Sequence, residues 1–144
     1  MAKKPPASKT REIDSAGLRN SAIFPLMRVL IADDQKSVGA SLADLVRHCQ
    51  HEVVEVVTSG LEAIQAYGRH HPDVVLMDYQ MPKLNGATAC RNILAKYPDA
   101  RVVLVSGAIH DIGDSGALAI LQKPVDLDEL YGALYNASQP RPST

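Results

Sequence analysis

Five polar side chains follow four short apolar runs of this sequence, and their types suit chemistry at a shared site. The runs, each typical of a buried strand, span residues 28–32, 73–77, 101–105 and 117–121. The polar residues that follow them are Asp33, Asp34, Asp78, Ser106 and Lys123. In a doubly wound parallel sheet all strands end at one edge, where ligands bind. We therefore expect three carboxylates, a hydroxyl and an ammonium group to meet at that edge.

Three carboxylates in one cluster require a compensating charge. Two unit charges about 4 Å apart repel by roughly 4 kcal/mol at an effective dielectric constant near 20, so the cluster must hold protons or a cation. Hard carboxylate oxygens at a wet loop edge suit Mg²⁺, which keeps several waters and takes one or two protein carboxylates. The predicted ligands are Asp33, Asp34, Asp78 and the backbone carbonyl of Gln80.

Asp78 is the best candidate for a nucleophile, because it leaves a central strand into the middle of the cluster. Attack by its carboxylate on a phosphoryl donor would give an acyl phosphate, an established covalent route for carboxylates. Mg²⁺ and the Lys123 ammonium would neutralise oxygens of the transferred group, and the Ser106 hydroxyl would donate a hydrogen bond to another. Gly107 leaves room beside the site, and the Lys123-Pro124 bond is a candidate cis peptide that aims the lysine.

The elements that must position these groups alternate between strands and helices from Met27 onward. Apolar residues at helical spacing follow the first strand, a second strand covers residues 53–57, and Ser59 with Glu62 forms a capping box. Asp126, with Glu129 three residues later, begins the last helix. Five strand–helix units in 144 residues are too few for an eight-stranded barrel of about 250 residues. The predicted fold is α/β: a five-stranded parallel, doubly wound, flavodoxin-like sheet of order 2-1-3-4-5 with helices on both faces.

The chain divides into three predicted regions. Residues 1–26, rich in Lys, Pro, Ser and Ala, form an arm that is flexible or docks on a neighbour, although Met27 is an alternative start. Residues 27–138 form the domain and residues 139–144 a tail, with no second domain expected after Pro140.

The net charge of −1 gives no sign of a basic surface that would bind nucleic acid. No membrane span or signal peptide is evident, so a cytoplasmic protein with reduced Cys49 and Cys90 is expected.

The residues of the predicted site also carry a family resemblance. Asp33-Asp34, the run of residues 74–82 around Asp78, Ser106-Gly107 and Lys123-Pro124 resemble the receiver domain of two-component response regulators, over about residues 27–137. The resemblance implies a regulatory phosphoprotein rather than an enzyme, with a histidine kinase or histidine phosphotransfer protein as the donor to Asp78. It further implies that Asp34 ligates Mg²⁺ directly and Asp33 through water, and that Ser106 moves toward the phosphate. Output would come through an unidentified protein partner, a phosphorelay or a homodimer.

Two departures from the family pattern stand out. Ile120 occupies a position where many receivers carry Tyr or Phe, so aromatic switching in that form is not expected. The segment 107–122 contains two glycines and leaves little room for a full fourth helix, which puts the usual dimer face in doubt. Both departures resemble a divergent receiver group that often works with HWE-class kinases.

Other interpretations exist for the clustered acids and for a group of His and Cys residues. Asp33 and Asp34 could cap a helix, and His48, Cys49 and His51 could bind a soft metal. The alternative function is a Mg²⁺-dependent phosphatase of the haloacid-dehalogenase type. Those enzymes carry Asp-x-Asp, whereas Asp33-Asp34-Gln35 and Asp78-Tyr79-Gln80 both lack the second, spaced acid. A flavin site is disfavoured because Asp33 and Asp34 would repel its phosphate.

Overall fold

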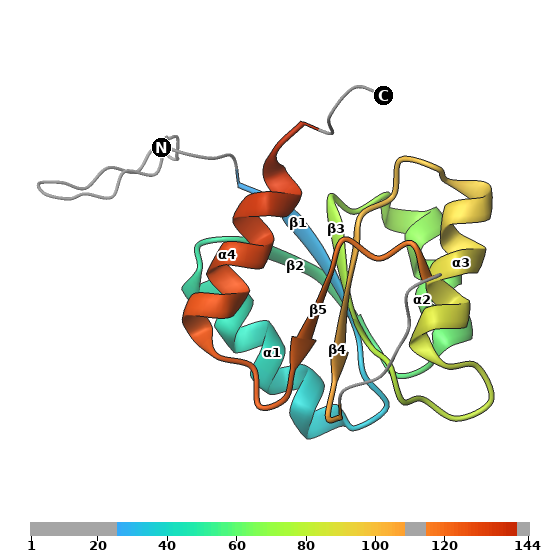
Figure 1. Cartoon of the computed structure of the whole chain (residues 1–144), viewed down its shortest axis with the longest axis horizontal. Coiled ribbons are helices and arrows are strands. Elements are labelled where there is room, and N and C mark those ends of the chain that lie inside the picture. Colours follow the sequence, from blue (N-terminus) through green and yellow to red (C-terminus); the bar gives the residue numbers. More distant parts are fainter. Residues whose placement is uncertain (1–25, 109–114, 141–144) are drawn as a thin grey trace, which may run out of the picture.

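A single five-stranded sheet organises the molecule. The computed structural model describes residues 26–108 and 115–140 (Figure 1). All strand pairs are parallel and the order is β2-β1-β3-β4-β5, as predicted. The strands are β1 (Arg28–Ala32), β2 (Glu52–Val57), β3 (Val74–Asp78), β4 (Val102–Ser106) and β5 (Ala119–Gln122).

Within residues 26–108 and 115–140, four helices cover the two faces of the sheet. Figure 1 shows α1 (Lys36–His48) and α4 (Leu127–Ser138) on one face, and α2 (Gly60–His70) and α3 (Gly86–Lys96) on the other. Alternate residues of the central strands enter two separate cores: Ile31 packs among residues of α1 and α4, and Leu30 among residues of α2 and α3. Because β1, β3 and β4 are buried on both sides, they read as continuous apolar runs in the sequence. No helix in these ranges is both long and apolar enough to span a bilayer.

Side-chain caps fix where the helices around the site begin. The Ser59 hydroxyl accepts the Glu62 N–H (3.1 Å), and the Asp126 carboxylate accepts the N–H groups of Asp128 and Glu129 (3.0 and 3.2 Å). Both caps confirm the sequence prediction, and such caps typically contribute about 1 kcal/mol. Helix α3 is capped in the same way by Asn85.

Two arginines at the opposite, amino-terminal edge of the sheet bind the ends of helices on its two faces. Nη1 of Arg28 donates to the carbonyls of His70 and His71 (2.8 and 3.1 Å) at the end of α2. Nη1 of Arg101 donates to the carbonyls of Ala137 and Gln139 at the end of α4. The strands therefore hold the helices at the edge away from the polar cluster.

The last strand begins two residues later than the sequence indicated. Gly116 adopts a positive φ of 83°, and the Ser115 hydroxyl accepts the Ala117 N–H (3.1 Å), so the chain is still turning at residue 117 and extends only from Ala119. Most of the expected arm (residues 1–25), part of the tail (141–144) and the middle of the shortened segment (109–114) lie outside the described residues.

Candidate functional site

Three carboxylates meet where β1 and β3 end side by side. The two strands are adjacent, with Ala32 paired to Met77, so Asp33 and Asp34 emerge beside Asp78. Each of the three offers an oxygen, and these oxygens lie within 4.8 Å of one another. Asp33 and Asp78 are buried, at 0% and 4% exposure, whereas Asp34 is exposed. The cluster predicted from the sequence is therefore present, with two members inside and one at the rim.

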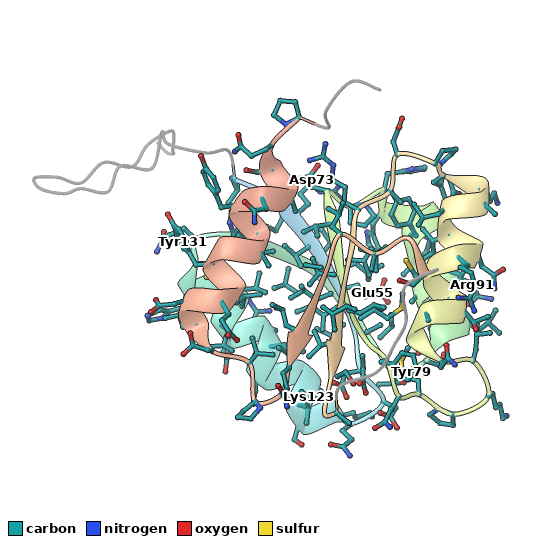
Figure 2. The ribbon with its side chains drawn as sticks, in the orientation of Figure 1. Glu55, Asp73, Tyr79, Arg91, Lys123 and Tyr131 are labelled. Carbon is teal, nitrogen blue, oxygen red and sulfur yellow. The ribbon has the colours of Figure 1, made fainter. Side chains whose placement is uncertain are left out.

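Lys123 joins this cluster from the far edge of the sheet. Its Nζ atom lies 3.1 Å from Oδ2 of Asp33 and 3.3 Å from Oδ1 of Asp78. The Lys123-Pro124 peptide is cis, as predicted, and the Lys123 N–H donates to the Ser106 carbonyl (2.8 Å). Figure 2 shows Lys123 at the same edge of the sheet as Tyr79, the residue that follows Asp78.

Burial and neighbouring charges shift the pKa values of both Asp78 and Lys123. Burial raises the pKa of Asp78, the Asp33 carboxylate raises it further, and the Lys123 ammonium offsets only part of the rise. Burial lowers the pKa of Lys123, but hydrogen bonding and charge from Asp33 and Asp78 outweigh burial, so its pKa is raised overall. A protonated lysine thus faces two buried carboxylates, with a third at the rim. The excess of negative oxygen ligands fits a hard divalent cation such as Mg²⁺.

The two oxygens of Asp33 already have different partners. Oδ1 accepts the Gln35 N–H (2.9 Å), and Oδ2 faces Lys123. Helix α1 begins after Gln35 and has no side-chain cap. The alternative interpretation, in which Asp33 or Asp34 is an ordinary helix cap, is therefore wrong. The soft-metal alternative also loses support, because Nδ1 of His51 accepts the Met27 N–H (3.0 Å) inside the fold.

Ser106 ends β4 next to Asp78 but directs its hydroxyl into its own loop. Its Oγ donates to the Ala108 carbonyl (2.6 Å) and accepts the Ala108 N–H (3.2 Å). The side chain is 1% exposed. A Cβ added at Gly107, the next residue, would meet no atom within 4 Å, so there is open space beside Gly107. Ser106 therefore lies at the site without contacting its carboxylates in this state.

The loop after Asp78 carries Gln80, whose N–H donates to Oδ1 of Asp78 (3.3 Å). Gly86 closes this loop: its N–H donates to the Tyr79 carbonyl (2.7 Å), and a Cβ there would lie 2.3 Å from the Asp78 carbonyl oxygen. The sequence alone did not indicate this role of Gly86.

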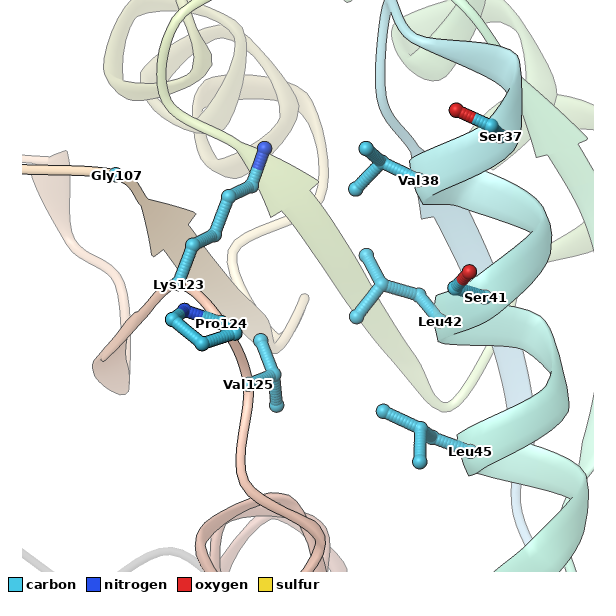
Figure 3. Close-up of a pocket in the computed structure, with 9 residues that line it drawn as sticks. All are labelled: Ser37, Val38, Ser41, Leu42, Leu45, Gly107, Lys123, Pro124 and Val125. Carbon is cyan, nitrogen blue, oxygen red and sulfur yellow. The ribbon is translucent and has the colours of Figure 1, made fainter.

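A groove of about 600 Å³ lies between α1 and the chain after β5. Figure 3 shows Val38, Leu42 and Leu45 of α1 facing Pro124 and Val125 across it, with the Lys123 side chain extending from one end. These three residues belong to the apolar positions at helical spacing that follow the first strand in the sequence. Only Leu42 is buried, and Val38 and Leu45 are half-buried.

Sequence comparison identifies the family. The model of the response regulator receiver domain matches residues 29–135. The chemotaxis protein CheY of Listeria monocytogenes is 32% identical over 119 residues, covering 79% of this chain and 100% of that protein. The transcriptional regulatory protein PdtaR of Mycobacterium tuberculosis is 35% identical over 111 residues, covering 74% of this chain and 54% of that protein.

Structural comparison agrees with the sequence match. The response regulator domain of Thermotoga maritima CheB has a TM-score of 0.73 at 29% identity, covering 82% of this chain and 100% of that one. The CheX–CheY–BeF3–Mg²⁺ complex from Borrelia burgdorferi has a TM-score of 0.74 at 25% identity, covering 81% of this chain and 92% of that one. Because the family model covers residues 29–135 and relatives above 30% identity match most of the chain, this chain belongs to the receiver domains of two-component response regulators.

Proposed function

We propose that the domain formed by residues 27–138 accepts a phosphoryl group on Asp78 in a Mg²⁺-dependent reaction, and that it signals by altered partner binding or as a phosphorelay intermediate. Receiver domains are regulatory phosphoacceptor domains that bind Mg²⁺ in an acidic pocket. The observation that carries the proposal for these residues is the position of Asp78: it is buried, beside two further carboxylates and 3.3 Å from the Lys123 ammonium.

The residues have distinct roles in this proposal. A carboxylate oxygen of Asp78 bonds to phosphorus as the donor's P–N bond breaks, and the electron pair of that bond passes to the imidazole nitrogen. Lys123 neutralises charge on the phosphoryl oxygens. Ser106 exchanges its bond to the Ala108 carbonyl for one to a phosphoryl oxygen, which couples acceptance of phosphate to the loop after β4.

The proposed metal ligands are Asp34, Asp78 and the Gln80 carbonyl, with Asp33 acting through water. Asp34 is exposed and can meet a hydrated ion, whereas both Asp33 oxygens already have partners in the protein. When bound, Mg²⁺ supplies positive charge that offsets the carboxylates and the phosphoryl group. In this assignment, the carboxylates whose charge Lys123 does not balance serve to hold the metal ion.

The groove beside the site supports a helical phosphodonor. Receiver domains interact with histidine kinases or phosphotransfer proteins. An apolar helix face laid between Leu45 and Val125 would bring a histidine on that helix toward Lys123 and Asp78. We propose a kinase of the HWE class, because Ile120 replaces the usual aromatic residue and the segment 107–122 is short. The output is an unidentified protein partner or a second copy of the chain.

The proposed function is regulatory rather than enzymatic. The family match gives no support to the haloacid-dehalogenase alternative. A turnover activity would require repeated loss of phosphate from Asp78, whereas a regulator retains it long enough to be read.

Intact mass measurement tests the acceptor directly. The full chain is incubated with Mg²⁺ and acetyl phosphate, beside Asp78→Asn and an EDTA control. We expect a gain of one phosphoryl group that needs Mg²⁺, is labile to hydroxylamine and is absent from the variant. An equal gain in Asp78→Asn, or rapid donor breakdown without any phosphorylated protein, would contradict the proposal.

A further inference from the structure

We propose that Gly60, the first residue of α2, is a positioning residue for the Mg²⁺ site: it sets the place of the loop 79–85, which carries Gln80. The inference rests on the proposed function of the Asp78 site. Gly60 is distant from Asp78 in sequence and does not belong to the cluster of carboxylates. Its effect on the site would pass through Leu84, which lies in the same loop as Gln80.

Gly60 and Leu84 approach too closely for any side chain at position 60. A Cβ there would lie 2.8 Å from the Leu84 carbonyl oxygen and 3.2 Å from both Cβ and Cδ2 of Leu84. The nearest of these atoms belongs to the backbone, so no rotation of a side chain relieves the contact. Either the start of α2 or the loop must move.

The start of α2 is the more firmly held of the two segments. Ser59 caps the helix, and Oε1 of Glu62 accepts the Thr58 N–H (2.9 Å) across the same turn. One turn into the helix, Ala63 and Ala66 are 0% exposed and packed in the core. A Cβ at position 60 would therefore displace Leu84 and its loop rather than the helix.

A displacement of Leu84 would move the part of the loop that carries Gln80, because the residues on the other side of Leu84 have no room to move. Leu84 N–H donates to the Pro82 carbonyl (2.7 Å), and Lys83 has a positive φ of 69°, so residues 82–84 form one tight turn. Beyond this turn, Gly86 lies against the Asp78 backbone with no space for a Cβ. The movement is left to residues 80–82, where the Gln80 N–H contacts Asp78 and the Gln80 carbonyl is the proposed ligand.

The requirement for glycine at position 60 comes from this contact and not from the helix itself. Helices α1 and α4 begin with Lys36 and Leu127 at the equivalent position. The backbone of Gly60 does not have the positive φ that favours glycine, whereas Gly116 does. Close approach to the metal-binding loop is thus the specific reason for glycine here.

Mg²⁺ titration of ¹⁵N-labelled full chain, followed by amide chemical shifts without any phosphodonor, tests the inference. The variants are Gly60→Ala and the matched control Gly68→Ala, which lies on the same helix, is exposed, and would place its Cβ 3.3 Å from the Tyr97 hydroxyl. We expect Gly60→Ala to weaken Mg²⁺ binding about tenfold, the lower end of what loss of outer-sphere support costs a metal site. We expect Gly68→Ala to bind Mg²⁺ as the unmodified chain does. Shift changes in metal-free Gly60→Ala should concentrate in residues 79–85.

The outcomes separate this inference from the function on which it rests. Unchanged Mg²⁺ affinity in folded Gly60→Ala, with binding intact in the unmodified chain, would overturn the inference alone. Failure of the unmodified chain to bind Mg²⁺ would overturn the proposed function and the inference with it. If Gly60→Ala does not fold, Leu84→Ala serves instead: it keeps Gly60 and removes the Leu84 Cδ2 atom, which lies beside the place that a Cβ at residue 60 would take. Weaker Mg²⁺ binding by Leu84→Ala supports the inference, and unchanged binding overturns it.

Discussion

Lys123 and Asp33 are 90 residues apart in the chain, yet Nζ of one lies 3.1 Å from Oδ2 of the other. The pair links the chain after β5, an edge strand, to the end of central β1. Asp33 is fully buried and Lys123 is 24% exposed at its side chain. The contact therefore lies where the effective dielectric constant is lower than at the surface and charge interactions are stronger. The Lys123 ammonium neutralises one of two adjacent buried carboxylates.

Replacement of Lys123 by Ala should destabilise the Mg²⁺-free protein. The change leaves Asp33 and Asp78 buried without their cation, and breaking a buried ion pair from one side typically costs about 3 kcal/mol. Urea denaturation in EDTA measures the loss. Lys96→Ala is the control, since Lys96 is exposed on α3 and, among the described residues, contacts the Tyr97 ring alone. Its stability change should stay within about 0.5 kcal/mol. Equal effects of the two substitutions would contradict the buried pairing.

Asp78→Asn should raise the free energy of unfolding when Mg²⁺ is absent. Asp78 and Asp33 are buried side by side and share one ammonium group, so a neutral amide at position 78 removes repulsion while filling similar space. Saturating Mg²⁺ should reverse the order, because only the unmodified chain then gains the full binding energy. Thermal melts in EDTA and in Mg²⁺ make the comparison, with Asp44→Asn on the exposed face of α1 as control. Lower stability of Asp78→Asn in EDTA would show that repulsion between the carboxylates does not destabilise the Mg²⁺-free protein.

Much of this site could be predicted because all strands of a parallel sheet end at the same edge, so the strand order determines which of the following residues are neighbours. Once β1 and β3 were recognised as buried strands, the neighbouring places of Asp34 and Asp78 followed from the strand order. The closeness of Gly60 to Leu84 could not be predicted in the same way, because it depends on how deeply one loop packs against a helix. The hydrogen bond from Ser106 to Ala108 likewise depends on a side-chain rotation that no sequence spacing determines.

Arg101→Ala should loosen the end of α4. The guanidinium donates to two carbonyls beyond the last helical hydrogen bonds, and bonds from charged donors contribute about 1.5–3 kcal/mol. We expect a loss of this size in chemical denaturation, with faster hydrogen exchange confined to the last turn of α4. Arg91→Ala should change stability by less than about 0.5 kcal/mol. Among the described contacts, the Arg91 side chain makes only an exposed hydrogen bond to the Thr88 hydroxyl. Uniform acceleration of exchange across the sheet would argue that Arg101 acts on the core instead.

Cys90 should make the stability of the domain depend on pH above neutrality. Burial raises the pKa of this thiol from 9.0 to about 11, with the Arg91 charge acting weakly against the rise. The unfolded chain releases the proton near pH 9 while the folded chain retains it, so the thiol lowers folding stability progressively between pH 9 and 11. Relative to Cys90→Ala, the unmodified chain should lose roughly 2–3 kcal/mol over that interval, since each pKa unit corresponds to about 1.4 kcal/mol.

Urea denaturation of the unmodified chain and Cys90→Ala at pH 8, 9, 10 and 11 measures this difference, because lysines and tyrosines titrate alike in both proteins. The alanine variant starts less stable at pH 8, as the buried sulfur is lost from the core. The two stability curves should therefore converge as pH rises. Parallel curves would mean that the Cys90 thiolate is tolerated in the folded core, and that α3 opens enough to admit water at this residue.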